Sequence, residues 1–163
     1  MPSASKIERA AARCRSAVAE SPRAAAIRPR AAWQWPISGR AFRLTVSDVD
    51  RSVDFYARVL GFRKLMDLNP GAFLSNGAIG LGIGPFPHPT RAIPGDRFDE
   101  NRIGLDHMSF AVPSRAALED AVRVLDQHGI AHSEVRDLGE AFGIAILIFR
   151  DPDNIQLELS GPR

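Results

Sequence analysis

The clearest pattern of polar and apolar positions lies in residues 104–112, GLDHMSFAV, where the two kinds of side chain alternate. Successive side chains of a β-strand point to opposite faces, so this stretch predicts a strand with one polar and one apolar face. The polar face carries His107, Ser109 and Ala111, and the apolar face carries Met108, Phe110 and Val112. Residues 41–46, AFRLTV, alternate in the same way but contain no histidine. The chain therefore predicts two related strands, of which only the second carries a histidine.

Each of these strands is followed by a pattern typical of an amphipathic helix. In the first half, the apolar residues at positions 49, 53, 56 and 60 recur at helical spacing. Asp48 or Asp50 can cap the start of this helix, and Gly61 suits its end. In the second half, Ser114 caps a helix expected to run to residue 127, and Gly129 stops it.

The remaining apolar stretches predict three strands after each helix. We expect them at residues 62–66, 72–75 and 78–83 in the first half, and at residues 131–135, 143–149 and 155–159 in the second. The sequence thus predicts an α+β fold of two βαβββ modules facing each other. Module one covers residues 41–84, a proline-rich connector without regular structure covers 85–103, and module two covers 104–160.

Residues 1–40 differ from the rest of the chain in composition. They are rich in alanine and arginine and contain 8 basic and 2 acidic side chains, whereas residues 41–163 contain 13 basic and 17 acidic ones. An arginine-rich, acid-poor stretch is also typical of an organelle transit peptide. We expect a disordered or weakly ordered extension over 1–40 and one folded domain over 41–163.

The same numbers exclude several classes of function for the domain. A mildly acidic domain does not present the basic surface that nucleic-acid phosphates require. Cys14 is the only cysteine, so there is neither a disulfide framework nor a cysteine-based metal site. No apolar run approaches the roughly 18 residues of a membrane span. We therefore expect a cytoplasmic protein with no nucleic-acid and no membrane partner.

Three stretches, LTVSDVDRSVDFYARVLGF, GLDHMSFAVPS and FRDPDNIQLEL, resemble the vicinal oxygen chelate superfamily. This group includes glyoxalase I, type I extradiol dioxygenases and bleomycin-resistance proteins. The resemblance implies that the paired modules curve into a cleft that holds a small molecule. It also implies a divalent metal, such as Zn, Fe, Mn or Ni, held by side chains from the first and last strand of each module. Because modules of this family commonly pair edge to edge, a homodimer is expected.

Only two of the four ligand positions implied by the resemblance carry a donor atom. His107 and Glu158 match the ligand positions of module two, whereas Ala41 and Gly82 stand at those of module one. Two protein ligands fall short of the three or four that hold Zn²⁺ or Fe²⁺ firmly. His88, in the connector, is a candidate third ligand, although a solvated loop histidine is the simpler interpretation.

His107 and Glu158 therefore allow three interpretations. They are ordinary polar residues of a cleft, a ligand-binding or acid/base pair, or the remainder of a metal site. A histidine beside a carboxylate is a reasonable acid/base unit, because the carboxylate fixes the tautomer of the imidazole.

Module one contributes a second clue through the stretch GLGIG. If Glu158 faces the cleft, Gly82 does so too, together with Gly80 and Gly84, which would leave volume unfilled. The glycines equally permit a bend or a bulge. Arg43 faces inward by the same count, and either pairs with Glu158 or meets an anionic group of a ligand.

Two functions of different class follow from these residues. The first is a small-molecule binder that resembles bleomycin-resistance proteins and has a degenerate metal site. Its ligand-binding residues would be Arg43, Thr45, Gly82, Ser109 and Gln156. The second is a metal-dependent lyase, isomerase or oxygenase resembling glyoxalases and dioxygenases, with His107 and Glu158 as catalytic and metal-binding residues.

Overall fold

The computed structural model describes residues 41–163, which belong to one compact unit. The disordered extension expected over residues 1–40 lies outside the described residues. Module one contains β1 (Ala41–Thr45), α2 (Val49–Leu60), β2 (Arg63–Asp67), β3 (Ala72–Ser75) and β4 (Gly80–Gly84). Module two contains β5 (Met108–Ala111), α3 (Arg115–Gln127), β6 (Arg136–Asp137), β7 (Ile144–Arg150) and β8 (Gln156–Pro162). A 3-10 turn, η1 (Pro89–Arg91), lies in the connector between them.

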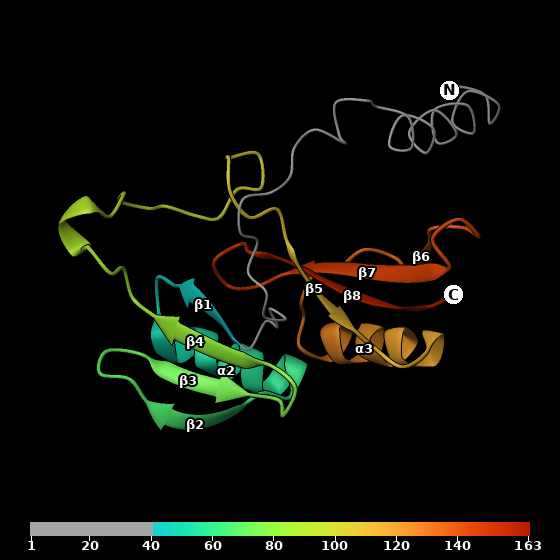
Figure 1. Ribbon diagram of the computed structural model, residues 1–163, viewed down its shortest axis with the longest axis horizontal. Coiled ribbons are helices and arrows are strands. Elements are labelled where there is room, and N and C mark those ends of the chain that lie inside the picture. The colour runs from blue at the N-terminus through green and yellow to red at the C-terminus, as the bar shows by residue number, and fades with distance from the viewer. Residues whose placement is uncertain (1–40) are drawn as a thin grey trace, which may run out of the picture. The chain divides into compact units, whose positions relative to one another are not determined.

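The two modules have the same strand order and the same pairing directions. The first sheet has the order β1-β4-β3-β2 and the second the order β5-β8-β7-β6 (Figure 1). In each sheet the first strand pairs in parallel with the last, and the other pairs are antiparallel. The expected α+β fold of two βαβββ modules is confirmed.

The helices begin and end where local sequence signals place them. The Asp48 side chain accepts a hydrogen bond from the Arg51 backbone N–H and caps α2, while Gly61 closes that helix with a φ of 67°. That left-handed conformation costs a glycine little. Ser114 caps α3 in the same way by accepting from the Ala117 N–H.

Two of the expected strands differ in the structure. Residues 131–135 were expected to form a strand, but only an isolated bridge from His132 to Phe149 occurs there, and β6 follows as a two-residue strand. The Ser133 hydroxyl accepts a hydrogen bond from the Ile148 N–H, so a side chain takes the place of a regular ladder contact. The first strand of module two is shorter than expected and begins at Met108.

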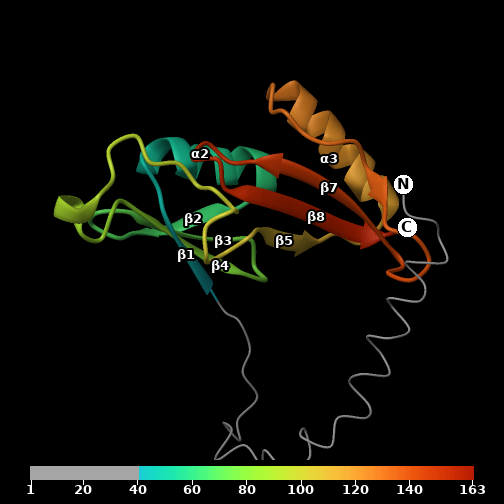
Figure 2. The same ribbon diagram turned by 90° about the horizontal axis from the view of Figure 1, so that it is seen from above.

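The helices cover one side of the sheets, as Figure 2 shows. Alternation along the strands explains this: Leu81 and Ile83 of β4 are fully buried in the core, together with Leu118 of α3. No helix within residues 41–163 is long and apolar enough to cross a membrane.

Contacts within this core also join the modules. The Tyr56 hydroxyl, on α2, donates to Asp151 Oδ2 at 3.0 Å, at the turn between β7 and β8. The rings of Phe62 and Phe110 meet edge to face, 6.2 Å apart. Helix α2 of module one is thereby fixed against the turn of module two.

Candidate functional site

The polar face of β5 and β8 forms a continuous row of hydrogen-bonding side chains. Ser109 lies directly opposite Glu158 in the parallel ladder, and its hydroxyl donates to Glu158 Oε1 at 2.7 Å. The same hydroxyl is 3.2 Å from Ser160 Oγ. The alternation in residues 104–112 therefore predicted the right face, since Met108 is buried on the other side.

His107 stands one residue before β5 and faces the same row. Its Nδ1 is 2.6 Å from Asp106 Oδ1, and its Nε2 is 4.0 Å from Glu158 Oε1. The carboxylate of Asp106 can accept the proton of Nδ1, which leaves Nε2 as the acceptor nitrogen that faces Glu158. The structure thus brings His107 and Glu158 together as expected, and adds Asp106. The adjacent position of Asp106 in the sequence was a signal for this contact.

A charged cluster closes one end of the row. Gln156 Oε1 accepts a hydrogen bond from Arg150, which also makes two hydrogen bonds to Glu100 in the connector, at 2.8 and 2.5 Å. These bonds lower the pKa of Glu100 to about 2, because the guanidinium favours the charged carboxylate. Nothing in the sequence pattern pointed to Glu100, and Gln156 is held by this cluster.

The residues at the four implied metal positions do not form a ligand set. His107 Nε2 and Glu158 Oε1 are within reach of each other, but Ala41 lies opposite Gly80, and Gly82 lies opposite Arg43. No group of three or more His, Cys, Asp or Glu side chains is placed to hold a metal ion anywhere in residues 41–163. His88, considered as a third ligand, belongs to no such group. A firm Zn²⁺ or Fe²⁺ site needs at least three protein ligands, so the donors present do not fit a metal.

Arg43 occupies the space beside the glycines of β4. A methyl group added to Gly82 would lie 3.6 Å from Arg43 Cγ, and one added to Gly84 would lie 2.6 Å from Arg43 Nη2. The arginine stem therefore lies across Gly82, and its guanidinium lies over Gly84. The expectation of unfilled volume along this face is wrong at these two positions, because the arginine covers them. The pairing considered between Arg43 and Glu158 does not occur within residues 41–163, where the ion-pair partner of Glu158 is His107.

An open pocket of about 630 Å³ lies next to the Arg43 side chain. Its other lining residues are Pro70, from the turn between β2 and β3, and five connector residues: Pro85, Phe86, Pro87, Pro89 and Ala92. Arg43 is its only charged lining residue.

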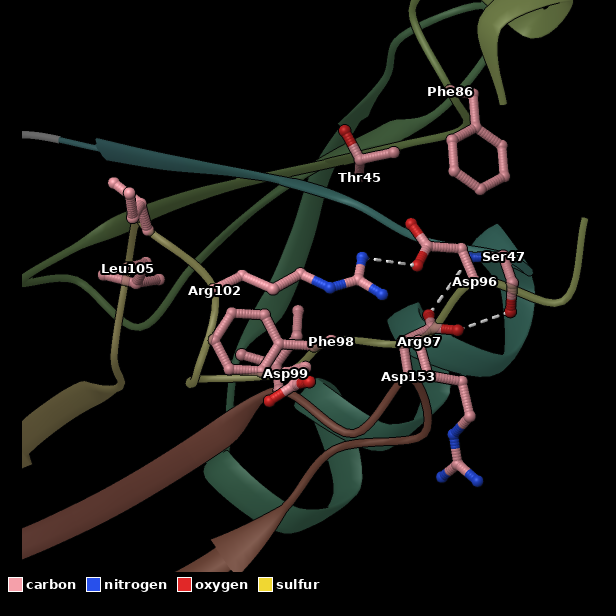
Figure 3. Close-up of a pocket in the computed structure, with 13 residues that line it drawn as sticks. Thr45, Ser47, Phe86, Asp96, Arg97, Phe98, Asp99, Arg102, Leu105 and Asp153 are labelled. Atoms are coloured by element: carbon pink, nitrogen blue, oxygen red, sulfur yellow. Dashed lines mark hydrogen bonds and ion pairs between the residues drawn. The ribbon is translucent and has the colours of Figure 1, made fainter. Parts of the chain in front are cut away.

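Thr45 lines a different pocket, of about 250 Å³, drawn in Figure 3. Arg102 reaches across this pocket to Asp96 at 3.0 Å. On its far side the Ser47 backbone N–H donates to Asp153 Oδ2 at 3.1 Å. Arg102 and Asp96 are thus paired with each other, and Asp153 is held by Ser47.

The proposed ligand-binding residues therefore fall into separate groups within one chain. Arg43 and Gly82 lie together on module one, and Ser109 and Gln156 lie in the row that holds His107 and Glu158 on module two. Neither of the two pockets described above is lined by residues from both groups. Figure 1 shows why: β1 and β5 belong to different sheets.

Comparisons with known proteins agree on the fold. A model of the glyoxalase/bleomycin resistance protein/dioxygenase superfamily matches residues 40–159. A curated relative from Arabidopsis thaliana, named Glyoxylase I 4, is 33% identical over 117 residues, which cover 68% of this chain and 63% of the relative. The chain thus spans less than two thirds of that relative's length.

Solved structures show the same architecture. A glyoxylase/bleomycin resistance protein/dioxygenase domain from Frankia sp. EAN1pec has a TM-score of 0.62 at 28% identity, covering 79% of this chain and 93% of its own. A lactoylglutathione lyase from Agrobacterium tumefaciens has a TM-score of 0.61 at 21% identity, covering 77% of this chain and 94% of its own. At 21% identity, the likeness to the lactoylglutathione lyase shows the fold alone.

Proposed function

Because this chain belongs to the glyoxalase/bleomycin resistance protein/dioxygenase superfamily, we propose that it binds a small organic molecule in a cleft whose metal site is degenerate. The observation that carries this proposal is the donor set. Ala41 and Gly82 supply no side-chain donor at the two module-one positions, and His107 and Glu158 alone make half a site.

We further propose that two copies of the chain complete the cleft. β1 and β5 each lie at an edge of their four-stranded sheet, so each leaves one side of its backbone without a partner strand within residues 41–163. Pairing of β1 with the β5 of a second copy would satisfy both edges and join the two sheets across the copies. It would not restore a metal site, since every copy brings the same Ala41 and Gly82.

A second candidate is an enzyme that uses His107 and Glu158, and the 4.0 Å approach of His107 Nε2 to Glu158 Oε1 favours it. The name of the relative from Arabidopsis thaliana points to glyoxalase-type lyase or isomerase chemistry, and the family also includes oxygenases. The Asp106–His107 contact supports a metal-free variant, in which Nε2 of His107 takes a proton from the bound molecule. In that variant Glu158 would stabilise the imidazolium that forms.

The first test is elemental analysis of untagged protein purified without chelator, together with the molar mass in solution. We expect less than stoichiometric metal after exposure to Zn²⁺, Fe²⁺, Mn²⁺ or Ni²⁺, and a mass equal to twice that of the chain. Near-stoichiometric metal that is lost in His107→Ala, but kept in the control His128→Ala, would overturn the degenerate site and favour the enzyme. A monomer at all concentrations would overturn the shared cleft.

A further inference from the structure

We propose that Arg43 and the proline-lined pocket beside it take a small organic anion with a flat apolar body. This inference rests on the proposed small-molecule binding and names the class of ligand. It is carried by three features of the described residues: the way Arg43 lies on β4, the absence of a charged partner for it, and the apolar wall that it faces.

The first feature is a resting place for the arginine made by two glycines. Gly82 and Gly84 lie on the same face of β4, and Arg43 is the residue directly opposite Gly82 in the ladder. Arg43 Cγ and Cβ would lie 3.6 and 3.7 Å from a methyl group at Gly82, an ordinary contact. At Gly84 the corresponding distances are 2.6 Å to Nη2 and 3.2 Å to Cζ, so a methyl group there would require the flexible end of the arginine to shift. The absent side chain of Gly84 therefore leaves room for the guanidinium as it lies here.

The second feature is the charge of Arg43. No ion pair within residues 41–163 includes this side chain, whereas Arg150 and Arg102 each bind a carboxylate. None of the seven residues that line the pocket is acidic. The guanidinium is planar and presents its N–H groups as a fork, which matches a carboxylate, phosphate or sulfonate with two parallel hydrogen bonds.

The third feature is the wall opposite the guanidinium. Four prolines and Phe86 supply rigid, apolar surface that loses little conformational entropy when a ligand binds. The volume of about 630 Å³ is in the range of pockets that bind small molecules. The Arg43 cation and this apolar surface line the same pocket, a combination that fits an anion carrying an aromatic or alicyclic group.

The test compares two fluorescent probes of similar shape that differ in charge: the anion 1-anilinonaphthalene-8-sulfonate and the neutral N-phenyl-1-naphthylamine. We expect Arg43→Gln to weaken binding of the anion about tenfold or more, because a charge-assisted hydrogen-bonded pair is lost. Binding of the neutral probe should stay within about twofold of the wild type. Arg43→Lys keeps the charge without the fork, and should fall between the wild type and Arg43→Gln.

A glycine variant and a charge control test this arrangement. Gly84→Ala should shift the guanidinium and weaken anion binding. Arg63→Gln removes an exposed arginine of β2 that does not line the pocket, and should leave anion binding unchanged. Circular dichroism and the unfolding midpoint of both variants should match the wild type within error.

Each outcome decides something different. Equal loss of both probes in Arg43→Gln, or equal affinity of wild type and Arg43→Gln for the anion, would overturn the anion site and leave the proposed small-molecule binding in place. If neither probe binds the wild type, the inference about this pocket is overturned, while the proposed function is decided separately by the metal content and the molar mass.

Discussion

Tyr56 joins the two modules through one buried hydrogen bond, which makes it a sensitive test of how the domain is held together. It is the only tyrosine in the chain and is fully buried. Its hydroxyl donates to Asp151 Oδ2 at 3.0 Å, while Asp151 Oδ1 accepts from the backbone N–H groups of Asp153 and Ile155 at 2.9 and 2.8 Å. The turn between β7 and β8 and the helix α2 therefore depend on the same carboxylate.

The structure sets the size of the effect expected from Tyr56→Phe. The ring keeps its edge-to-face contacts with Phe55 and Phe62, so the substitution leaves no cavity larger than the lost oxygen. What is lost is one hydrogen bond to a charged acceptor, which leaves Asp151 Oδ2 buried without a donor. Such a loss costs about 1.5–3 kcal/mol in the free energy of unfolding.

The assay is urea unfolding of the wild type, Tyr56→Phe, Asp151→Asn and the double variant. Burial raises the pKa of Asp151, so the ionised carboxyl is costly there and the neutral amide relieves part of that cost. We therefore expect Asp151→Asn to destabilise less than Tyr56→Phe, and the two effects to be non-additive because they remove one contact. A loss below about 0.5 kcal/mol for Tyr56→Phe, or full additivity, would refute the argument.

Three further predictions concern other contacts of the domain. The Ser133 carbonyl and Asp126 raise the pKa of His132. Protonated His132 should therefore stabilise the fold fully below pH 6.5, and this stabilisation should be lost as the pH rises through the raised pKa. In urea unfolding at several pH values, His132→Gln should remove this pH dependence. Arg150 lowers the pKa of Glu100 to about 2, so their contact should persist above pH 4.5 and be lost as the pH falls through about 2. At neutral pH, Glu100→Gln should accelerate tryptic cleavage of the connector. Leu118→Ala should lower the free energy of unfolding by about 2–5 kcal/mol in a urea titration, because the side chain is fully buried.

The elements that the sequence predicted best are those governed by neighbouring residues. Alternation identified the faces of β5 and β4, and the caps Asp48 and Ser114 stand where their side chains reach the first free N–H groups of each helix. The strand over 72–75 matches β3 at both ends. For the two caps the deciding hydrogen bond lies within three residues along the chain.

The elements that it missed depend on partners far away in the chain. In residues 131–135 the Ser133 N–H donates to the Ile148 carbonyl, but the return bond from the Ile148 N–H goes to the Ser133 hydroxyl, so no regular ladder forms. Glu100 meets Arg150 across 50 positions, and nothing in the local pattern of the connector reveals that contact. The contact of Asp106 could have been predicted from the sequence, because Asp106 directly precedes His107 and an Asp-His pair is a familiar acid/base unit.

The face of β4 that carries Gly82 and Gly84 was assigned correctly, but the unfilled space expected beside it was not found. Alternation placed Gly82, Gly84 and Arg43 on one face, and the structure agrees. The length of the arginine decides the rest, because its stem covers one glycine and its guanidinium covers the next. Three glycines with no long neighbour would have left the space open.

This arrangement connects the absent metal ligands to the proposed anion site. A third ligand for a divalent ion would have to replace Ala41 or Gly82, and at Gly82 a side chain longer than a methyl group would meet the stem of Arg43, whose Cγ would lie 3.6 Å from a methyl group built there. Gly82 can therefore serve either a metal or the arginine as it lies here. A guanidinium keeps its positive charge without protein ligands, so under the proposed function it can hold an anionic group without a metal ion. Under the proposed function, the positive charge that attracts the ligand is that of Arg43 and not that of a bound metal ion.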